Sequence, residues 1–529
     1  MLDNYVAYRR DTGEAIDFPV EWAQPEDAQQ VWRWNGDHNP YPVTQLSAAF
    51  ASRSPVGPGA ASGSRPRAGI DVHGYRYGGG GGGRRGGGSR PTGQDDELDD
   101  RLSRIDEIWE HGWRARIEQE AEAVARADYD ALSLTELVRS MERCRDQIAT
   151  HMDLMFGALD IISYGRDRLS QFLGDKLGAD ENAEELTTAL LEGYWNASLE
   201  ANAALWDVAQ LAKDEPRLRA VIESGEPGSL RERLAAVEGA APLLAALEGW
   251  LDRYGGRAGD YGELIEPTWR EDPAPVAVLL RGYLDREDPR AAMPRAAARR
   301  QAAAAQIEAR LDAADRPEFA ALVAGVAPYI AVKESRNSVM TVSRGALRQP
   351  ALAVGRKLLA AGAIDALEDV FFLDFEEIEA LDHGPIAGLR QLIADRRAEY
   401  AFWRNVVPPV AIGEPSRAAA AADEGSIKGL GASKGRAQGR ARLILSLADA
   451  DRLQPGDVLV TTSTTSAWTP LFLNAAAVVT DSGGILSHCA VVARELALPA
   501  VVGTLTATRL IPDGALIDVD GTSGQVALI

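Results

Sequence analysis

One histidine, His488, stands where an apolar strand, a glycine turn and a helix are expected to meet, in the run VVTDSGGILSHCAVVARELALPAVV. The apolar residues 475–480 predict a buried strand, and Gly483 and Gly484 allow the chain to turn sharply after it. Apolar residues then recur at helical spacing until a proline. The sequence therefore predicts a helix that begins at His488, with Ser487 as its N-cap.

This position suits the transfer of a phosphoryl group. An imidazole ring is largely neutral near pH 7 and then offers a nitrogen lone pair to phosphorus. The phosphate would lie beside free N–H groups at the positive end of the helix dipole. His488 is therefore a candidate nucleophile, with Gly483, Gly484 and Ser487 shaping its anion site. The alternative is an ordinary polar residue in a turn. We expect a surface helix start with little apolar burial.

The surrounding motif strengthens this hypothesis. The run TDSGGILSHCAVVARELALPAVVGT resembles the phosphohistidine swivelling domain of the phosphoenolpyruvate-utilising enzymes, which reads roughly TDxGGxxSHAAIVARExGIPAVVGT. The resemblance covers residues 429–529, including GASKGRAQGRARLI, PGDVLVTTSTTSAWTPLF and DGALIDVDGTSGQV. It implies that His488 is the phosphorylated residue. Cys489 and Lys434 replace the family's usual Ala and Pro, and neither change touches the histidine.

Composition excludes several classes of protein. The chain has 529 residues, enough for two to four domains, and a formal net charge of −22, which argues against binding to nucleic acid or to an anionic membrane surface. Two cysteines are too few for a disulfide framework, and no Cys/His spacing predicts a metal site, so we expect a reducing cytoplasm. The N-terminus is too polar for a signal peptide, and no uncharged apolar run reaches transmembrane length.

Changes of composition along the chain predict a multidomain α plus α/β fold. A large α-helical acceptor domain is followed by a C-terminal β/β/α phosphohistidine swivelling domain. The predicted segments are an aromatic, Pro-rich strap packing on the helical domain (1–77), a flexible Gly/Arg loop (78–95), the α-helical acceptor-binding domain (96–410), a hinge linker (411–428) and the swivelling domain (429–529). Helical periodicity is clearest at 102–127, 133–165, 184–212, 230–254, 295–313, 316–348 and 351–361.

Two stretches of the first 170 residues hold candidate substrate-binding groups. His38 lies in a Trp- and Pro-rich segment that resembles the W…H.P.P.TPL opening of the acceptor region in relatives of rifampicin phosphotransferase and phenylphosphate synthase. His151 and Asp153 are polar members of the Met-rich run HMDLMFGALDIISYGRD. All three could face a substrate in a mainly apolar pocket. The alternative for both stretches is ordinary core packing.

A third stretch, 327–381, carries charge on an otherwise apolar helix. Lys333, Glu334 and Arg336 could form a catalytic patch that receives the phosphohistidine and stabilises charge on the transferring group. The alternative is the solvated face of an amphipathic helix. The stretch resembles the central domain of the same phosphotransferases, which has an RE-x-x-K/R-like run. Lys333 replaces the family's Arg, and Asn337 stands where a second basic residue is frequent, so the basic partner stays open.

No glycine-rich phosphate loop of the GxxxxGK[ST] type is present, and nothing resembles an ATP-binding domain. The resemblance then implies a phosphotransferase with paired acceptors, similar to phenylphosphate synthase, that converts ATP to AMP and phosphate. ATP and Mg²⁺ would be bound by a separate ATP-grasp-type subunit, and His488 would pass the phosphoryl group to a small, phenolic hydroxyl compound. Two alternatives remain: a phospho-relay or regulatory carrier, and a phosphoenolpyruvate-dependent phosphohistidine carrier.

Overall fold

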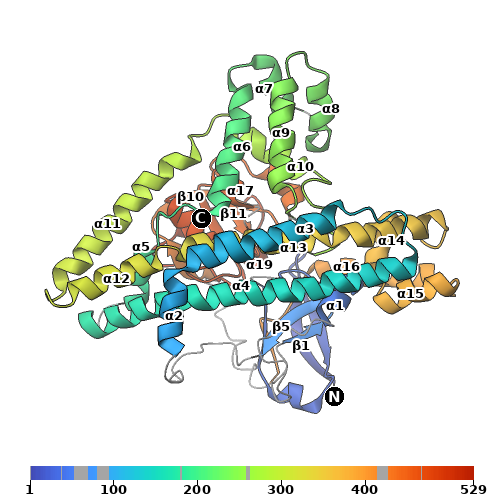
Figure 1. Ribbon diagram of the computed structural model, residues 1–529, viewed down its shortest axis with the longest axis horizontal. Helices are drawn as coiled ribbons and strands as arrows, with labels where there is room; N and C mark the ends of the chain where they lie inside the picture. Colours follow the sequence, from blue (N-terminus) through green and yellow to red (C-terminus); the bar gives the residue numbers. More distant parts are fainter. Residues whose placement is uncertain are drawn as a thin grey trace.

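The computed structural model describes residues 2–36, 39–52, 69–79, 94–178, 182–224, 226–257, 263–413, 427–465 and 468–529. Figure 1 shows three parts: a small N-terminal β region in blue, a set of long helices across the middle and top, and a C-terminal sheet domain in red behind those helices. The predicted class, α-helical followed by an α/β domain, is confirmed.

The N-terminal part folds into two small antiparallel sheets around an aromatic core. Their strands are β1 (Leu2–Arg9), β2 (Ala15–Glu21) and β6 (Val406–Val407) in the first, and β4 (Gly69–Val72), β5 (Tyr75–Gly79), β3 (Trp32–Trp34) and β7 (Ala411–Ile412) in the second. Phe18, Trp32 and Tyr75 are fully buried. The segment expected to be a strap therefore has a core of its own, closed by two strands that follow the last helix of the helical part.

Strand β7 anchors the end of the helical part. It pairs with β3, and the Gly413 N–H that follows donates to the Tyr5 hydroxyl at 2.8 Å. Gly413 has φ +87°, and a Cβ there would overlap the carbonyl oxygen of Gln30, so the position requires glycine. Of the predicted hinge, 414–426 lie outside the described residues, as do 80–93 of the predicted Gly/Arg loop.

The helical part is organised along α4 (Leu134–Leu177), the 44-residue helix that crosses Figure 1. A capping box between Ser133 and Glu136 fixes its start. Against it pack α12 (Arg316–Val326) and α13 (Tyr329–Ala346), and α3 (Ala115–Arg126) packs on α13. The predicted helix 316–348 is thus two helices, divided at Pro328, and the predicted helix 184–212 is α5 (Ala183–Leu190) and α6 (Ala197–Lys213).

The remaining helices complete this part. They are α1 (Gln45–Ser52), α2 (Gln94–Ser103), α7 (Pro216–Glu223), α8 (Leu230–Ala235), α9 (Ala241–Tyr254), α10 (Ala274–Tyr283), α11 (Ala292–Arg310), α14 (Arg348–Ala360), α15 (Phe375–His383) and α16 (Leu389–Arg404). A π-helical segment, Glu107–Arg114, joins α2 to α3. Within the described ranges, no helix combines the length and apolar character needed to cross a membrane.

The C-terminal domain is built on a mixed sheet with the order β8-β15-β14-β10-β11-β12-β13-β9. The strands are β8 (Ile427–Lys428), β9 (Leu430–Ser433), β10 (Arg436–Leu443), β11 (Val458–Thr461), β12 (Ala477–Thr480), β13 (Ala500–Val502), β14 (Leu516–Asp520) and β15 (Gln525–Leu528). Strands β10 to β13 run parallel, and the Val-rich β11, β12 and β13 are buried throughout, as parallel strands covered on both faces require.

Helix α18 (His488–Glu495) lies where this domain meets the helical part. Its Ala490 and Val492 belong to a core shared with α6, α9 and α10, and its Val491 belongs to the core around α4 and α13. The short helix α17 (Thr469–Phe472) also contacts α6 and α10. Apolar residues of α18 are therefore buried against two sets of helices, and the first residue of α18 lies at the contact between domains.

Candidate functional site

His488 begins α18 as the sequence predicts, with the Ser487 hydroxyl accepting the Ala490 N–H. Gly483, at φ +118°, makes the preceding turn. The prediction of an exposed site is wrong: only 5 % of His488 is accessible. The reason is that α13 of the helical part covers it.

Two side chains hold the imidazole ring of His488. Its Nδ1 lies 2.7 Å from Oε2 of Glu334, and its Nε2 lies 2.9 Å from the Thr469 hydroxyl. Burial would raise the pKa of Glu334, but Lys333 and His488 hold this pKa well below its usual range. An ionised carboxylate only accepts hydrogen bonds, so Nδ1 donates to Glu334. When the ring holds one proton, the lone pair of Nε2 accepts from Thr469.

Two basic side chains flank Glu334. Lys333 Nζ lies 3.0 Å from Oε1 of Glu334, and the Arg336 Nη2 donates to the Asn337 side chain at 3.0 Å. Burial lowers the pKa of Arg336, and the nearby Glu334 opposes this shift. Arg336 Nε is buried and finds no hydrogen-bond partner among the described residues. The predicted trio of Lys333, Glu334 and Arg336 therefore lies where α13 of the helical part meets the C-terminal domain, and Glu334 touches His488. We call this place the docking contact.

A second carboxyl group, Glu495, lies in the same contact. It is buried at the end of α18 and its Oε1 accepts from Asn196 Nδ2 at 3.0 Å, while Oε2 is buried without a partner in the described part of the chain. Burial and the charge of Glu334 raise the pKa of Glu495 well above its usual range. From the first turn of α6, the Ser198 hydroxyl donates to Oε2 of Glu334 at 3.4 Å.

Sequence reasoning missed four residues at this contact: Thr469, Asn196, Ser198 and Glu495. Thr469 and Glu495 stand inside the quoted motifs TTSTTSAWTPLF and ARE, so motif position was an available signal for them. Nothing in the sequence marks Asn196, which caps the start of α6, or Ser198 in its first turn as part of this contact.

Of the other predicted substrate-binding residues, the two that the structure describes, His151 and Asp153, are not brought to His488. His151 is buried within the helical part, with Nδ1 2.7 Å from the Ser343 hydroxyl and Nε2 2.7 Å from Glu120. Ser343 is nine residues after Glu334 on α13, about 13 Å along the helix. Burial lowers the pKa of His151, although Glu120 opposes this. Asp153 is exposed. His38 lies outside the described residues.

The N-terminal β region makes a second contact with the C-terminal domain. Arg10 Nη1 donates to the Thr462 hydroxyl at 3.0 Å, and the Tyr41 hydroxyl donates to the carbonyl of Leu445. The Tyr41 ring has Arg10 at 5.0 Å and Arg404 at 5.1 Å. The C-terminal domain is therefore held on two sides. No group of three or more His, Cys, Asp or Glu side chains in the described part is arranged to hold a metal ion.

Comparisons with known proteins match the helical part and the C-terminal domain to two different family models. Residues 453–524 match the family model described as PEP-utilising enzyme, mobile domain, and residues 155–334 match the model described as rifampicin phosphotransferase fourth domain. The first match includes His488 and the second ends at Glu334. The C-terminal part is therefore a mobile domain of the PEP-utilising enzymes, next to a helical part of the rifampicin phosphotransferase type, and the predicted resemblance is confirmed.

Individual relatives agree with this assignment. Rifampicin phosphotransferase of Streptomyces sviceus is 32% identical over 69% of this chain and 42% of its own length. An uncharacterised phosphotransferase of Bacillus subtilis is 30% identical over 69% of this chain and 45% of its own. Chondramide synthase of Chondromyces crocatus is 29% identical over 97% of this chain but only 14% of its own. The chain thus spans less than half of these relatives. A solved Enzyme I structure, 13% identical over 64% of this chain and 82% of that one, has a TM-score of only 0.17.

Proposed function

We propose that the chain is a phosphotransferase in which Nε2 of His488 carries a phosphoryl group and transfers it to the hydroxyl of a small, phenolic acceptor. The observation that carries this proposal is the buried array of Glu334, His488 and Thr469, which fixes the ring and leaves Nε2 as the nucleophile. The names of the relatives, several of them phosphotransferases, support it.

The array accounts for both steps of the transfer. During loading, the Nε2 lone pair forms a bond to phosphorus while the bond from phosphorus to the donor oxygen breaks, and the ring becomes cationic. During discharge, the acceptor oxygen bonds to phosphorus, the N–P bond breaks and its electrons return to Nε2, and the hydroxyl proton passes to water. Glu334 keeps Nδ1 protonated and balances the ring's charge in the docked state. Lys333 and Arg336 supply positive charge where the phosphoryl group is transferred.

The geometry divides these steps between two positions of the mobile domain. Thr469 belongs to the same domain as His488 and accompanies it, whereas Glu334 belongs to the helical part and reaches the ring only when the domains are docked. Because His488 is buried in the docked position, we propose that the donor meets it elsewhere. That donor is ATP with Mg²⁺, held by a separate ATP-grasp-type subunit.

A chemical donor tests the carrier role without a partner protein. Phosphoramidate is incubated with the whole chain, and phosphohistidine is followed by ³¹P NMR as a signal that acid removes and base preserves. We expect the signal in the wild type and in the control His383→Asn, an exposed histidine at the end of α15. His488→Asn keeps a polar side chain at the helix start but should give no signal. Equal labelling of His488→Asn would overturn the proposal.

A further inference from the structure

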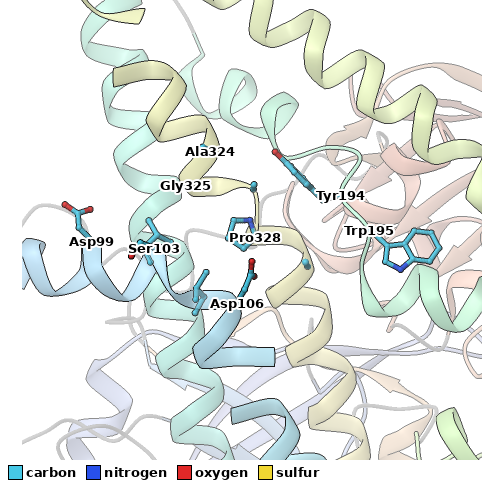
Figure 2. A pocket seen from close by; sticks show the side chains of 12 residues that line it. Asp99, Ser103, Asp106, Tyr194, Trp195, Ala324, Gly325 and Pro328 are labelled. Atoms are coloured by element: carbon cyan, nitrogen blue, oxygen red, sulfur yellow. The ribbon is translucent and has the colours of Figure 1, made fainter. Parts of the chain in front are cut away.

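A cavity of about 610 Å³ opens beside the N-terminal end of α13 (Figure 2). It lies where α2, the start of the π-helical segment, the residues before α6 and the α12–α13 junction meet. Its lining residues are Asp99, Leu102, Ser103, Ile105, Asp106, Tyr194, Trp195, Ala324, Gly325, Ala327, Pro328 and Ala331. Its volume is within the range of sites that bind small organic molecules.

Helix α13 links this cavity to the phosphate carrier. Pro328 and Ala331 line the cavity, and Glu334 follows Ala331 by three residues, so Ala331 and Glu334 are neighbours on the helix surface with about 5–6 Å between their Cβ atoms. On the opposite wall, Trp195 directly precedes Asn196, which binds Glu495 of α18. Each of these two walls is therefore followed in the chain by a residue that contacts the mobile domain, Glu334 in one case and Asn196 in the other.

The π-helical segment provides an independent sign of function at this place. It begins directly after the lining residue Asp106, and its buried Trp109 donates through Nε1 to the Ser335 hydroxyl at 3.0 Å. Ser335 is the neighbour of Glu334. Wide helical turns of this kind are rare and are frequent at functional sites. This one fixes the wall of the cavity to the residue beside the catalytic carboxylate.

The chemistry of the walls selects the ligand. Most of the lining is apolar or aromatic, and Trp195 leaves 43% of its surface accessible. The charged lining residues are two aspartates, with no basic residue among the twelve. Asp99 is already bound by Arg168 and by the Tyr164 hydroxyl. The Asp106 carboxylate makes no hydrogen bond or ion pair with any residue that the structure describes. In Figure 2 the Asp106 carboxylate lies close to Pro328.

We propose that this cavity is the acceptor site and that it takes an aromatic hydroxyl compound bearing a cationic amine. The aromatic ring packs on Trp195 and Pro328, the ammonium group lies by Asp106, and the hydroxyl points along α13 toward Glu334 and His488. The assignment of an acceptor rests on the proposed function, whereas the preference for a cationic aromatic ligand rests on the cavity itself.

Three phenols of similar size test the preference: tyramine, which is cationic, 4-ethylphenol, which is neutral, and 4-hydroxyphenylacetate, which is anionic. Binding to the whole chain is measured by saturation-transfer NMR, and no phosphoryl transfer is needed. Because Asp106 is exposed, we expect tyramine to bind at most about five-fold more tightly than 4-ethylphenol, with the anion weakest. Asp106→Asn should remove this order, and Trp195→Ala should weaken all three phenols.

Asp96→Asn is the matched control, because Asp96 is exposed on α2 but does not line the cavity. It should keep the order of affinities, which separates a local effect of Asp106 from the general negative charge of the chain. Equal binding of the three phenols, or an order that survives Asp106→Asn, would overturn the inference. The phosphoramidate experiment fails or succeeds independently, so failure of the cavity assignment and failure of the carrier role are distinguishable.

Discussion

Glu334 and His488 are 154 positions apart in the sequence, yet their side chains meet at 2.7 Å and both are buried. Each comes from a different domain, so the hydrogen bond exists only while the mobile domain is docked on α13. The bond therefore reports the position of the domain as well as the orientation of the ring. This dual role separates the effects expected for the residues around His488.

Glu334→Gln should slow discharge while leaving loading nearly unchanged. The substitution keeps the shape of the side chain but removes the charge that balances the phosphorylated ring, and we expect a loss on the order of 100-fold in transfer to the acceptor. Single-turnover assays with chain already phosphorylated by phosphoramidate separate the two rates. Glu318→Gln, an exposed change on α12, is the control. A loading rate that falls as much as discharge would contradict the division of roles.

Thr469→Val should give the opposite pattern. Thr469 is the ring partner that accompanies His488 away from α13, so its loss leaves Nε2 unsupported during loading. A net hydrogen-bond contribution of about 0.5–1.5 kcal/mol predicts labelling roughly two- to thirteen-fold slower. The rate of phosphohistidine formation checks this, with Thr150→Val on the exposed face of α4 as the control. Unchanged labelling would show that the hydroxyl does not orient the ring.

Tyr41→Phe should weaken docking without unfolding either domain. The change removes the hydrogen bond to the Leu445 carbonyl but keeps the ring between Arg10 and Arg404. One hydrogen bond of about 1 kcal/mol predicts roughly five-fold more frequent exposure of His488. The rate of its modification by diethyl pyrocarbonate, read by mass spectrometry, measures this exposure. Tyr129→Phe, whose hydroxyl binds Val124 within the helical part, should have no effect.

Docking should weaken as pH rises, because the docked state binds a proton at Glu495. Its pKa is raised by burial and by Glu334, while Arg494, Asn196 and Lys333 oppose the rise. Outside the contact we expect the usual pKa, about 4.3. The contribution to docking is thus complete below that value and is lost as pH increases through the raised pKa.

Glu495→Gln, which cannot ionise, should make the exposure of His488 nearly independent of pH over this interval. The same modification assay, repeated at several pH values and corrected for the intrinsic reactivity of a histidine peptide, measures the slope. A slope equal to that of the wild type would assign the effect to another group.

Local sequence patterns predicted which residues form the site, but they did not predict that these residues are buried. The spacing around His488 gave the helix start and the Ser487 cap, because both depend on a few neighbouring residues. The burial of His488 depends on a contact between domains, which no periodicity reports. For the same reason Lys333 and Glu334 were candidates by type, whereas Thr469 and Asn196 were not.

The fold shows a similar limit. The long helix α4 was expected from its apolar spacing, and its start is set by the Ser133–Glu136 capping box. The N-terminal sheets were not expected from the sequence. Strands β3 and β5 are only three to five residues long, and the sheets are completed by β6 and β7, which follow more than 300 residues later. Pairing over such separations leaves no local signal in the sequence.

The fixed position of Gly413 limits how far the mobile domain, which carries His488, can move from the N-terminal sheets. Strand β7 and the Tyr5 hydroxyl fix that residue, and the sheet of the mobile domain begins at Ile427, fourteen residue steps later. Covalent geometry limits this tether to about 50 Å, however it is folded. The ATP-binding subunit that we propose would therefore have to hold its nucleotide within about that distance of Gly413, increased only by the size of the mobile domain.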